Sequence, residues 1–171
     1  GVVVVGGGFA AAARVILLLA CAAEPDGPPC EVSGDPGLEV APADVDFGSF
    51  VEGDPLDYGV PPQGGALYSP FHARVHGVND LDEGALIVLT GTDPTDGSVI
   101  AETEYELRLV CANVGESAGQ WLGTDLHLRF GEWTIEELAG RVMALDLQIA
   151  NLDGESVSAA LEGVLTPRQT G

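Results

Sequence analysis

Residues 98–112, SVIAETEYELRLVCA, alternate between apolar and charged side chains over most of their length. Successive side chains of a β-strand point to opposite faces of a sheet, so this alternation predicts a strand with one buried face and one wet face. The predicted buried face carries Val99, Ala101, Tyr105, Leu107, Leu109 and Cys111, and the wet face carries Glu102, Glu104, Glu106 and Arg108.

The same period of two recurs along most of the chain. It predicts further strands at residues 66–77, 84–91, 120–130, 141–150 and 156–165, with weaker ones near 38–41 and 46–51. Turn-forming residues separate these runs, and an Asp-Gly pair at 153–154, between two of them, predicts a hairpin.

Only residues 134–140 carry a helix signal. Thr134 followed by Glu137 is the pattern of an N-terminal capping box, and Gly140 would end the helix after one or two turns. Seven or eight short strands with almost no helix predict an all-β fold, a two-sheet antiparallel β-sandwich of immunoglobulin-like type. A small β-barrel is the main alternative.

The first twenty residues differ from the rest of the chain. They contain no acidic residue, and Val15 to Ala20 is an unbroken apolar run, which is typical of an export signal. We expect a signal peptide at 1–20, a lipidated cysteine and a proline-, glycine- and acid-rich tether at 21–37, the sandwich domain at 38–166 and a tail at 167–171. An uncleaved membrane helix of about 20 residues is the alternative for the leader.

The leader ends in Leu18-Leu19-Ala20-Cys21, which resembles the lipobox of bacterial lipoproteins. The resemblance implies cleavage before Cys21 and attachment of a diacylglycerol to its thiol, so that acyl chains and not polypeptide hold the protein at the membrane. Ala22 after the cysteine implies sorting to the outer membrane. We therefore expect an exported lipoprotein of the cell envelope.

A second resemblance covers residues 34–65, which look like the opening of uncharacterised myxobacterial secreted lipoproteins with a Pro-Gln-Gly-Gly turn. The matching positions are Leu38, Glu39, Val40, Gly53, Asp54, Pro62, Gln63, Gly64 and Gly65. The resemblance implies a β-sandwich and an exported context, and it brings no known activity. By itself, Pro62 to Gly65 predicts a tight turn, because proline fixes φ and glycine adopts positive φ.

The charge balance restricts the partners. Asp and Glu number 27 against six Arg and no Lys, which gives a net charge of −21. A surface this negative repels phosphate backbones and anionic lipid headgroups, so no nucleic-acid partner is expected. Calcium, a cationic partner or simple solubility remain as explanations of the acidity.

Cysteine usage predicts one disulfide. If Cys21 is lipidated, Cys30 and Cys111 remain, and two cysteines in an oxidising compartment are expected to pair. The bond would pin the tether to a central strand and close a loop of about 80 residues.

Two motifs suggest catalysis or zinc binding. Residues 115–119, GESAG, match the GxSxG motif of the nucleophile elbow, with Ser117 as the nucleophile. In an elbow the serine is followed by a helix, whereas a strand is predicted after this motif. We therefore interpret the match as chance and expect no catalytic residue. His72 and His76 are four residues apart, a spacing that pairs zinc ligands on a helix. On a strand it separates them by about 13 Å. His127 is predicted to lie with Asp125 and Arg129 on the solvated face of its own strand.

Calcium is a better hypothesis for an ion than zinc, and no other cofactor is expected. Oxygen-rich turns occur at Asn79, Asp80, Asp82 and Glu83, at Asp93 and Asp96, and at Asn151, Asp153 and Glu155. Turns are also rich in Asp and Asn for conformational reasons alone, which is the alternative. Trp121, Trp133 and Tyr68 suggest an aromatic ligand platform, with a place in the core as the competing interpretation.

The sequence therefore predicts a lipid-anchored, exported β-sandwich that serves as a structural or binding module of the envelope, with a protein or cell-surface partner. The alternatives are a secreted hydrolase that uses Ser117, a calcium-dependent adhesion module and a membrane-anchored assembly factor.

Overall fold

The computed structural model describes residues 30, 34–112 and 115–168. The predicted leader, Cys21 and most of the predicted tether lie outside the described residues. Within them are nine strands and one short helix: β1 (Gly37–Pro42), β2 (Pro55–Tyr58), β3 (Tyr68–His76), β4 (Ala85–Thr92), β5 (Val99–Leu107), β6 (Val110–Cys111), β7 (Trp121–Arg129), α1 (Ile135–Leu138), β8 (Val142–Asn151) and β9 (Ser156–Pro167).

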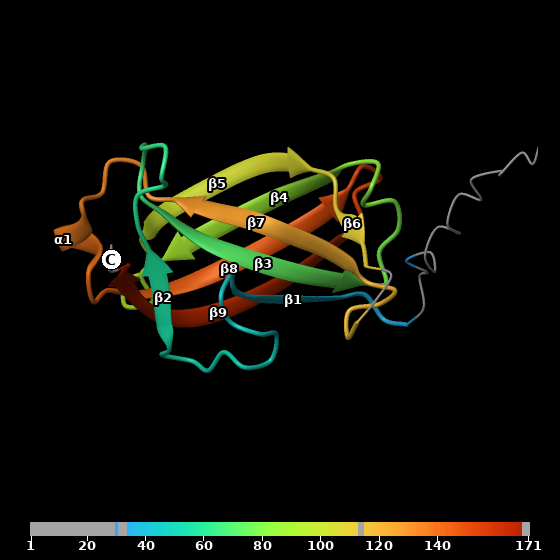
Figure 1. Ribbon diagram of the computed structural model, residues 1–171, viewed down its shortest axis with the longest axis horizontal. Helices are drawn as coiled ribbons and strands as arrows, with labels where there is room; N and C mark the ends of the chain where they lie inside the picture. The colour runs from blue at the N-terminus through green and yellow to red at the C-terminus, as the bar shows by residue number, and fades with distance from the viewer. Residues whose placement is uncertain (1–29, 31–33, 113–114, 169–171) are drawn as a thin grey trace, which may run out of the picture.

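The strands form two sheets that face each other (Figure 1). One sheet has the order β1-β3-β7-β6 and the other has the order β2-β9-β8-β4-β5. With β1, β3, β7 and β6 as strands A, B, E and D, and β9, β8, β4 and β5 as G, F, C and C′, this is the immunoglobulin-type arrangement. The predicted immunoglobulin-like β-sandwich is confirmed, with one correction, because β2 runs parallel to β9.

The stretch 98–112 is not one strand, as its alternation predicted, but two. β5 belongs to the five-stranded sheet and β6 to the four-stranded one. Between them the chain crosses from one sheet to the other. The buried residue Leu109 holds this crossing in place by donating its backbone N–H to the Leu81 carbonyl 2.9 Å away. Cys111 therefore lies on the edge strand β6 and not on a central strand.

The weak strand predicted at 46–51 is also wrong. Ser49 donates its N–H to the Asp46 carbonyl, and Gly48 has a φ of 78°, so this stretch turns. The strand of this region is β2, further along the chain. By contrast, α1 begins and ends as predicted, with a Thr134–Glu137 capping box and Gly140 at a φ of 80°.

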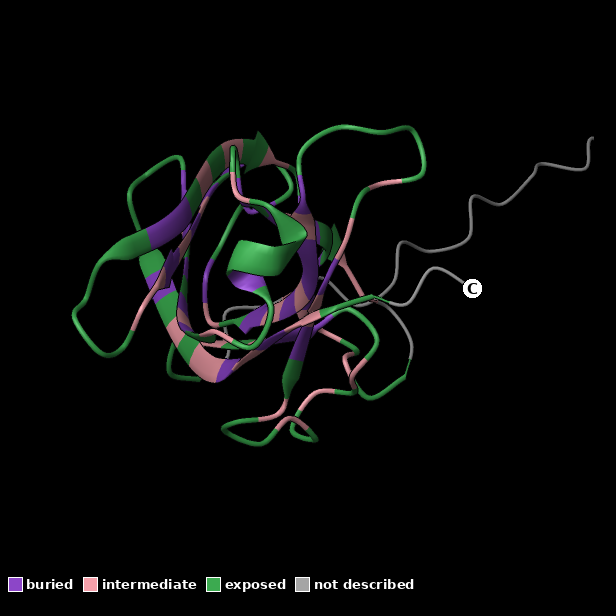
Figure 2. Cartoon of the chain, turned by 90° about the vertical axis from the view of Figure 1, so that its left-hand side faces the viewer, coloured by how far each residue is buried: buried purple, intermediate pink, exposed green. Residues whose placement is uncertain are grey.

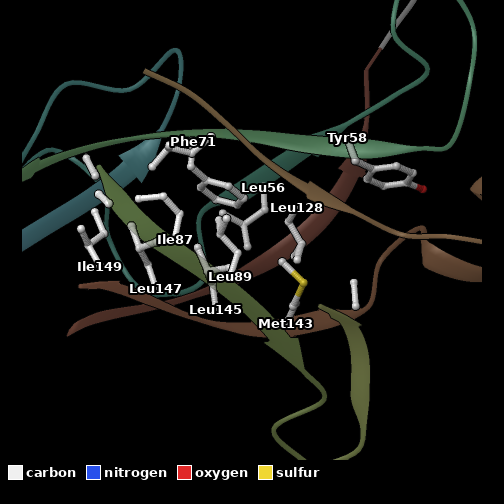
Figure 3. Close-up of a cluster of buried hydrophobic side chains, with 14 of the residues drawn as sticks. Leu56, Tyr58, Phe71, Ile87, Leu89, Leu128, Met143, Leu145, Leu147 and Ile149 are labelled. Atoms are coloured by element: carbon white, nitrogen blue, oxygen red, sulfur yellow. The ribbon is translucent and has the colours of Figure 1, made fainter. Parts of the chain in front are cut away.

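The core lies between the two sheets and follows the period of two (Figure 3). Along β8 every second side chain is buried, from Met143 to Ile149, and these face Phe71 and Leu128 of the opposite sheet. The short helix α1 covers one end of the sandwich (Figure 2). There Leu138 is buried and the Tyr58 hydroxyl donates to the Ile135 carbonyl at 2.7 Å.

Side chains of β5 close an edge that β6 leaves open. β6 pairs only with the first two residues of β7. Further along β7, the backbone N–H of His127 donates to the Tyr105 hydroxyl at 3.3 Å, and that of Arg129 donates to the Thr103 hydroxyl at 2.9 Å. Hydroxyl groups of one sheet thus accept hydrogen bonds from backbone N–H groups of the other. Without them, this part of β7 would be an open strand edge.

Among the described residues no helix is both long enough and apolar enough to cross a bilayer.

Candidate functional site

The sandwich has two distinct ends. Cys30 and Cys111 form the predicted disulfide, with their Cα atoms 5.7 Å apart, at the end where β7 begins. We call this the disulfide end. The opposite end, where β7 finishes at Arg129 and α1 lies, is the α1 end (Figure 1). β7 covers eight residue steps between them, which is about 26 Å at about 3.3 Å per residue.

A pocket of about 270 Å³ lies at the α1 end, on the outer face of the four-stranded sheet. Its floor is formed by Tyr68, His127 and Arg129, and the turn before β3 supplies Pro61 and residues 63–66 as its other wall. We call it the Arg129 pocket. Rings, a cation, a side-chain amide and glycine backbone converge there, which is the mixture typical of small-ligand sites.

Strand register builds the floor of the pocket. Tyr68 is the Cα partner of Arg129, and Pro70 is the partner of His127, in the antiparallel pair of β3 and β7. Partners of an antiparallel pair point to the same face, so these side chains gather outside the sheet. The Tyr68 and His127 rings have centroids 4.5 Å apart and an interplanar angle of 54°.

Glycines let the turn fold over this floor. Gly64 donates its N–H to the Pro61 carbonyl at 2.8 Å, which closes the turn predicted around Pro62. Gly64 and Gly65 have φ values of 79° and 123°, in the region that other residues rarely adopt. The turn therefore brings bare backbone, and the Gln63 amide, to the mouth of the pocket.

Burial and charges of both signs act on the imidazole of His127. Burial lowers the pKa of His127 below its ordinary value; Arg129 and Arg168 lower it as well, and Asp125 opposes them. The Arg168 side chain lies next to Gly59, whose backbone pairs with Tyr68 at the edge of the pocket. Near neutral pH, His127 is therefore a neutral ring able to donate or accept a hydrogen bond.

A larger hollow of about 430 Å³ lies on the outer face of the five-stranded sheet. Phe50, Ala144 and Ala160 contribute to it, together with Glu52 and Glu162. Both of its charged groups are acidic and it contains no hydrogen-bonding side chain of another kind, so it is the weaker candidate.

The other predicted histidines do not form a pair. His72 donates from Nε2 to the Val45 carbonyl at 2.7 Å and stacks on Phe47, with ring centroids 4.1 Å apart. His76 lies at the exposed end of β3, against Gly37.

The predicted calcium-binding turns lie at both ends of the sandwich. Asn79, Asp80, Asp82 and Asp153 are at the disulfide end, where the Asn151 amide donates to the Asn79 carbonyl, and Asp93 and Asp96 are at the α1 end. Asp93 and Asp96 accept the backbone N–H groups of Thr95 and Ser98, which is ordinary turn capping. In the described part of the chain no three His, Cys, Asp or Glu side chains converge in a way that would hold a metal.

Ser117 lies in the turn between β6 and β7, and a strand follows it, not a helix. The tryptophans are at opposite ends of the sandwich and form no shared platform. Trp121 is buried and donates to the Val78 carbonyl, and Trp133 donates to the Ile100 carbonyl. The interpretation of Trp121 as a core residue is confirmed, and Tyr68 alone of the three lines the pocket.

No protein-family model matches the chain, and no curated protein shows significant sequence similarity to it. Among solved structures, CopC from Methylosinus trichosporium OB3b is similar at 13% identity, with 71% of this chain and 90% of that one covered and a TM-score of 0.29. Murine CRIg is similar at 9% identity, with 80% and 100% covered and a TM-score of 0.33. The fold assignment rests on the strand order described above.

The Arg129 pocket is not predictable from the alternation of its strand, which places His127 and Arg129 on solvated surface. One signal pointed to it: both residues lie on the same face of one alternating strand. The other wall comes from a turn about sixty residues earlier, and alternation within a strand carries no information about what covers that strand.

Proposed function

We propose that this protein is an exported, lipid-tethered β-sandwich that acts as a binding module of the cell envelope and holds a small ligand in the Arg129 pocket. The observation that carries the proposal is the position of the pocket, about 26 Å from the Cys30–Cys111 bond, at the opposite end of the sandwich. A chain anchored through Cys21 would enter the domain at the disulfide end. The pocket would then face away from the bilayer.

The disulfide also supports export. Disulfides persist in oxidising compartments and are rare in the cytosol, where thiols are kept reduced. Cys30 follows Cys21 by nine residues, so an extended chain lets the bond lie at most about 32 Å from the lipidated residue. The domain would therefore be held close to the membrane.

The binding part of the proposal is tested by native mass spectrometry of the mature protein released gently from envelopes. We expect a small molecule to accompany the wild-type protein and to be absent from Ala66→Trp, because an indole at this pocket-lining position fills the cavity. Ala118→Trp is the matched control, since Ala118 is equally exposed and lies in the turn between β6 and β7. An unliganded wild-type protein, or equal occupancy in both variants, would refute the pocket as the binding site.

The anchoring part is tested separately by the mass of the mature N-terminus. We expect residues 1–20 to be absent, an acylated Cys21, and no free thiol at Cys30 or Cys111 before reduction. Recovery of the leader on an unmodified Cys21 would overturn the tether without bearing on the pocket.

A further inference from the structure

Two arginines lie at the Arg129 pocket although the protein is strongly acidic: Arg129 lines the pocket and Arg168 lies at its edge, and Asp125 is the acidic group that opposes them near His127. The net charge is −21, and two arginines elsewhere, Arg74 and Arg141, are paired with carboxylates. In the part of the chain that the structure describes, neither Arg129 nor Arg168 has a carboxylate oxygen within 4.0 Å. Among the described residues Arg108 has no carboxylate partner either, so what distinguishes Arg129 is its place in the lining of the pocket.

The shape of the pocket indicates a small ligand with a ring. A volume of about 270 Å³ lies just below the range of about 300–1,000 Å³ that is usual for drug-sized ligands. Tyr68 and His127 present two tilted rings on the floor, and aromatic surfaces pack well against the face or edge of another ring. The Gly64–Gly65 backbone allows close approach from the other side.

The geometry of the guanidinium group indicates the kind of anion. Attraction to Arg129 and repulsion by the net charge of the protein both grow in proportion to the ligand charge, so charge alone does not separate a carboxylate from a phosphate. A guanidinium group also matches a planar carboxylate with two parallel hydrogen bonds. Arg129 on the floor, with Arg168 nearby, is sufficient to bind one carboxylate.

We infer that the Arg129 pocket binds a small ring-shaped monocarboxylate, with Arg129 bonded to the carboxylate and the Tyr68–His127 rings packed against the ligand ring. This inference rests on the proposed function, since it names the ligand class of the same pocket. The Gln63 amide at the mouth supplies a further donor and acceptor for polar groups on the ring.

Isothermal titration of the mature protein in detergent at low ionic strength tests the inference with three probes: benzoate, its neutral analogue benzamide, and inorganic phosphate. We expect benzoate to bind at one site, and benzamide and phosphate to bind at least roughly tenfold more weakly. Arg129→Gln should weaken benzoate binding by roughly tenfold or more.

Arg108→Gln is the matched control. It removes the same charge from an exposed arginine between β5 and β6, at the disulfide end, and should change benzoate affinity by less than about twofold. Equal losses in the two variants would overturn the inference, because they would mean that only the overall charge matters. Benzamide or phosphate binding as tightly as benzoate would also overturn it, and so would the absence of saturable benzoate binding.

These outcomes are distinct from a failure of the proposed function. A natural ligand that is lost in Ala66→Trp but carries no carboxylate would leave the binding module standing and remove only the ligand class. If no ligand of any kind depends on Ala66, the pocket itself is refuted and the inference falls with it.

Discussion

Replacement of Cys30 and Cys111 by serine should lower the free energy of unfolding by about 4.5 kcal/mol at 25 °C. The bond joins residues 81 positions apart. The loop-closure relation converts the conformational entropy that such a cross-link removes from the unfolded chain into this free energy, and the serine variant regains that entropy. Unfolding entropy is about 2.1 cal/mol/K per residue, so for about 130 ordered residues the loss corresponds to a fall in Tm of about 16 °C.

Urea denaturation followed by tryptophan fluorescence measures this loss. Reduced wild-type protein is the control and should match the double serine variant, because both lack only the cross-link. The dependence of the free energy on urea should steepen, since an unfolded chain without the bond exposes more surface. A loss below about 1 kcal/mol would refute the reasoning, because it would mean that the unfolded chain gains little freedom when the loop opens.

Three further predictions concern a close backbone contact, the edge of β7 and the pocket histidine. Gly163→Ala should destabilise the fold by about 1–3 kcal/mol in urea, because its Cβ would lie 2.5 Å from the Asp54 carbonyl oxygen; Gly59→Ala, whose Cβ would lie 3.5 Å from that of Arg168, should cost less than about 0.5 kcal/mol. Thr103→Val should lower the free energy of unfolding by about 1 kcal/mol, because it removes the acceptor of the Arg129 N–H. Thr90→Val, on the outer face of β4, should not lower it, and equal losses in the two variants would contradict the edge-closing role of Thr103. Because the pKa of His127 is lowered in the folded state, the unfolded chain binds more protons as the pH falls below 6.5. Wild-type protein should therefore lose stability in that range relative to His127→Gln, and a difference in stability that does not depend on pH would contradict this assignment. Benzoate affinity should rise over the same range, because the imidazole becomes charged.

The strands were predictable from the sequence where their pattern is local and long. Alternation over eight or more residues located β3, β4, β7, β8 and β9 to within about two residues, and the Thr134–Glu137 pair located α1. The split of 98–112 was not predictable, because it depends on a bond from Leu109 to Leu81 in another loop. β2 was missed because it has four residues, and its parallel pairing with β9 becomes apparent only in the folded chain.

The site was less predictable than the fold, for a physical reason. His127 and Arg129 were predicted to share a face and do share one, but burial of that face depends on the turn at residues 61–66. The residues that drew attention first, Ser117 and the predicted calcium-binding aspartates, lie in turns, where Asp93 and Asp96 accept backbone N–H groups. Motifs of this kind are short and say nothing about which other segments lie beside them in the folded chain.

With the proposed anchor at Cys21, the disulfide would link the stability of the domain to the direction in which the pocket faces. The first strand begins at Gly37, sixteen residue steps after Cys21, which span at most about 58 Å when extended, and the bond at Cys30 shortens the free segment to nine steps and about 32 Å. The opposite end of the sandwich can face the bilayer only when the point of attachment stands about 26 Å away, a distance that the nine-residue segment reaches only near full extension and the sixteen-residue segment reaches easily. An acidic coat adds repulsion from anionic headgroups in that orientation. If the protein is held at the membrane through Cys21, as we propose, reduction would remove about 4.5 kcal/mol of stability and also lengthen the segment that holds the domain, so ligand capture from solution by the anchored protein should fall on reduction even at temperatures where the fold persists.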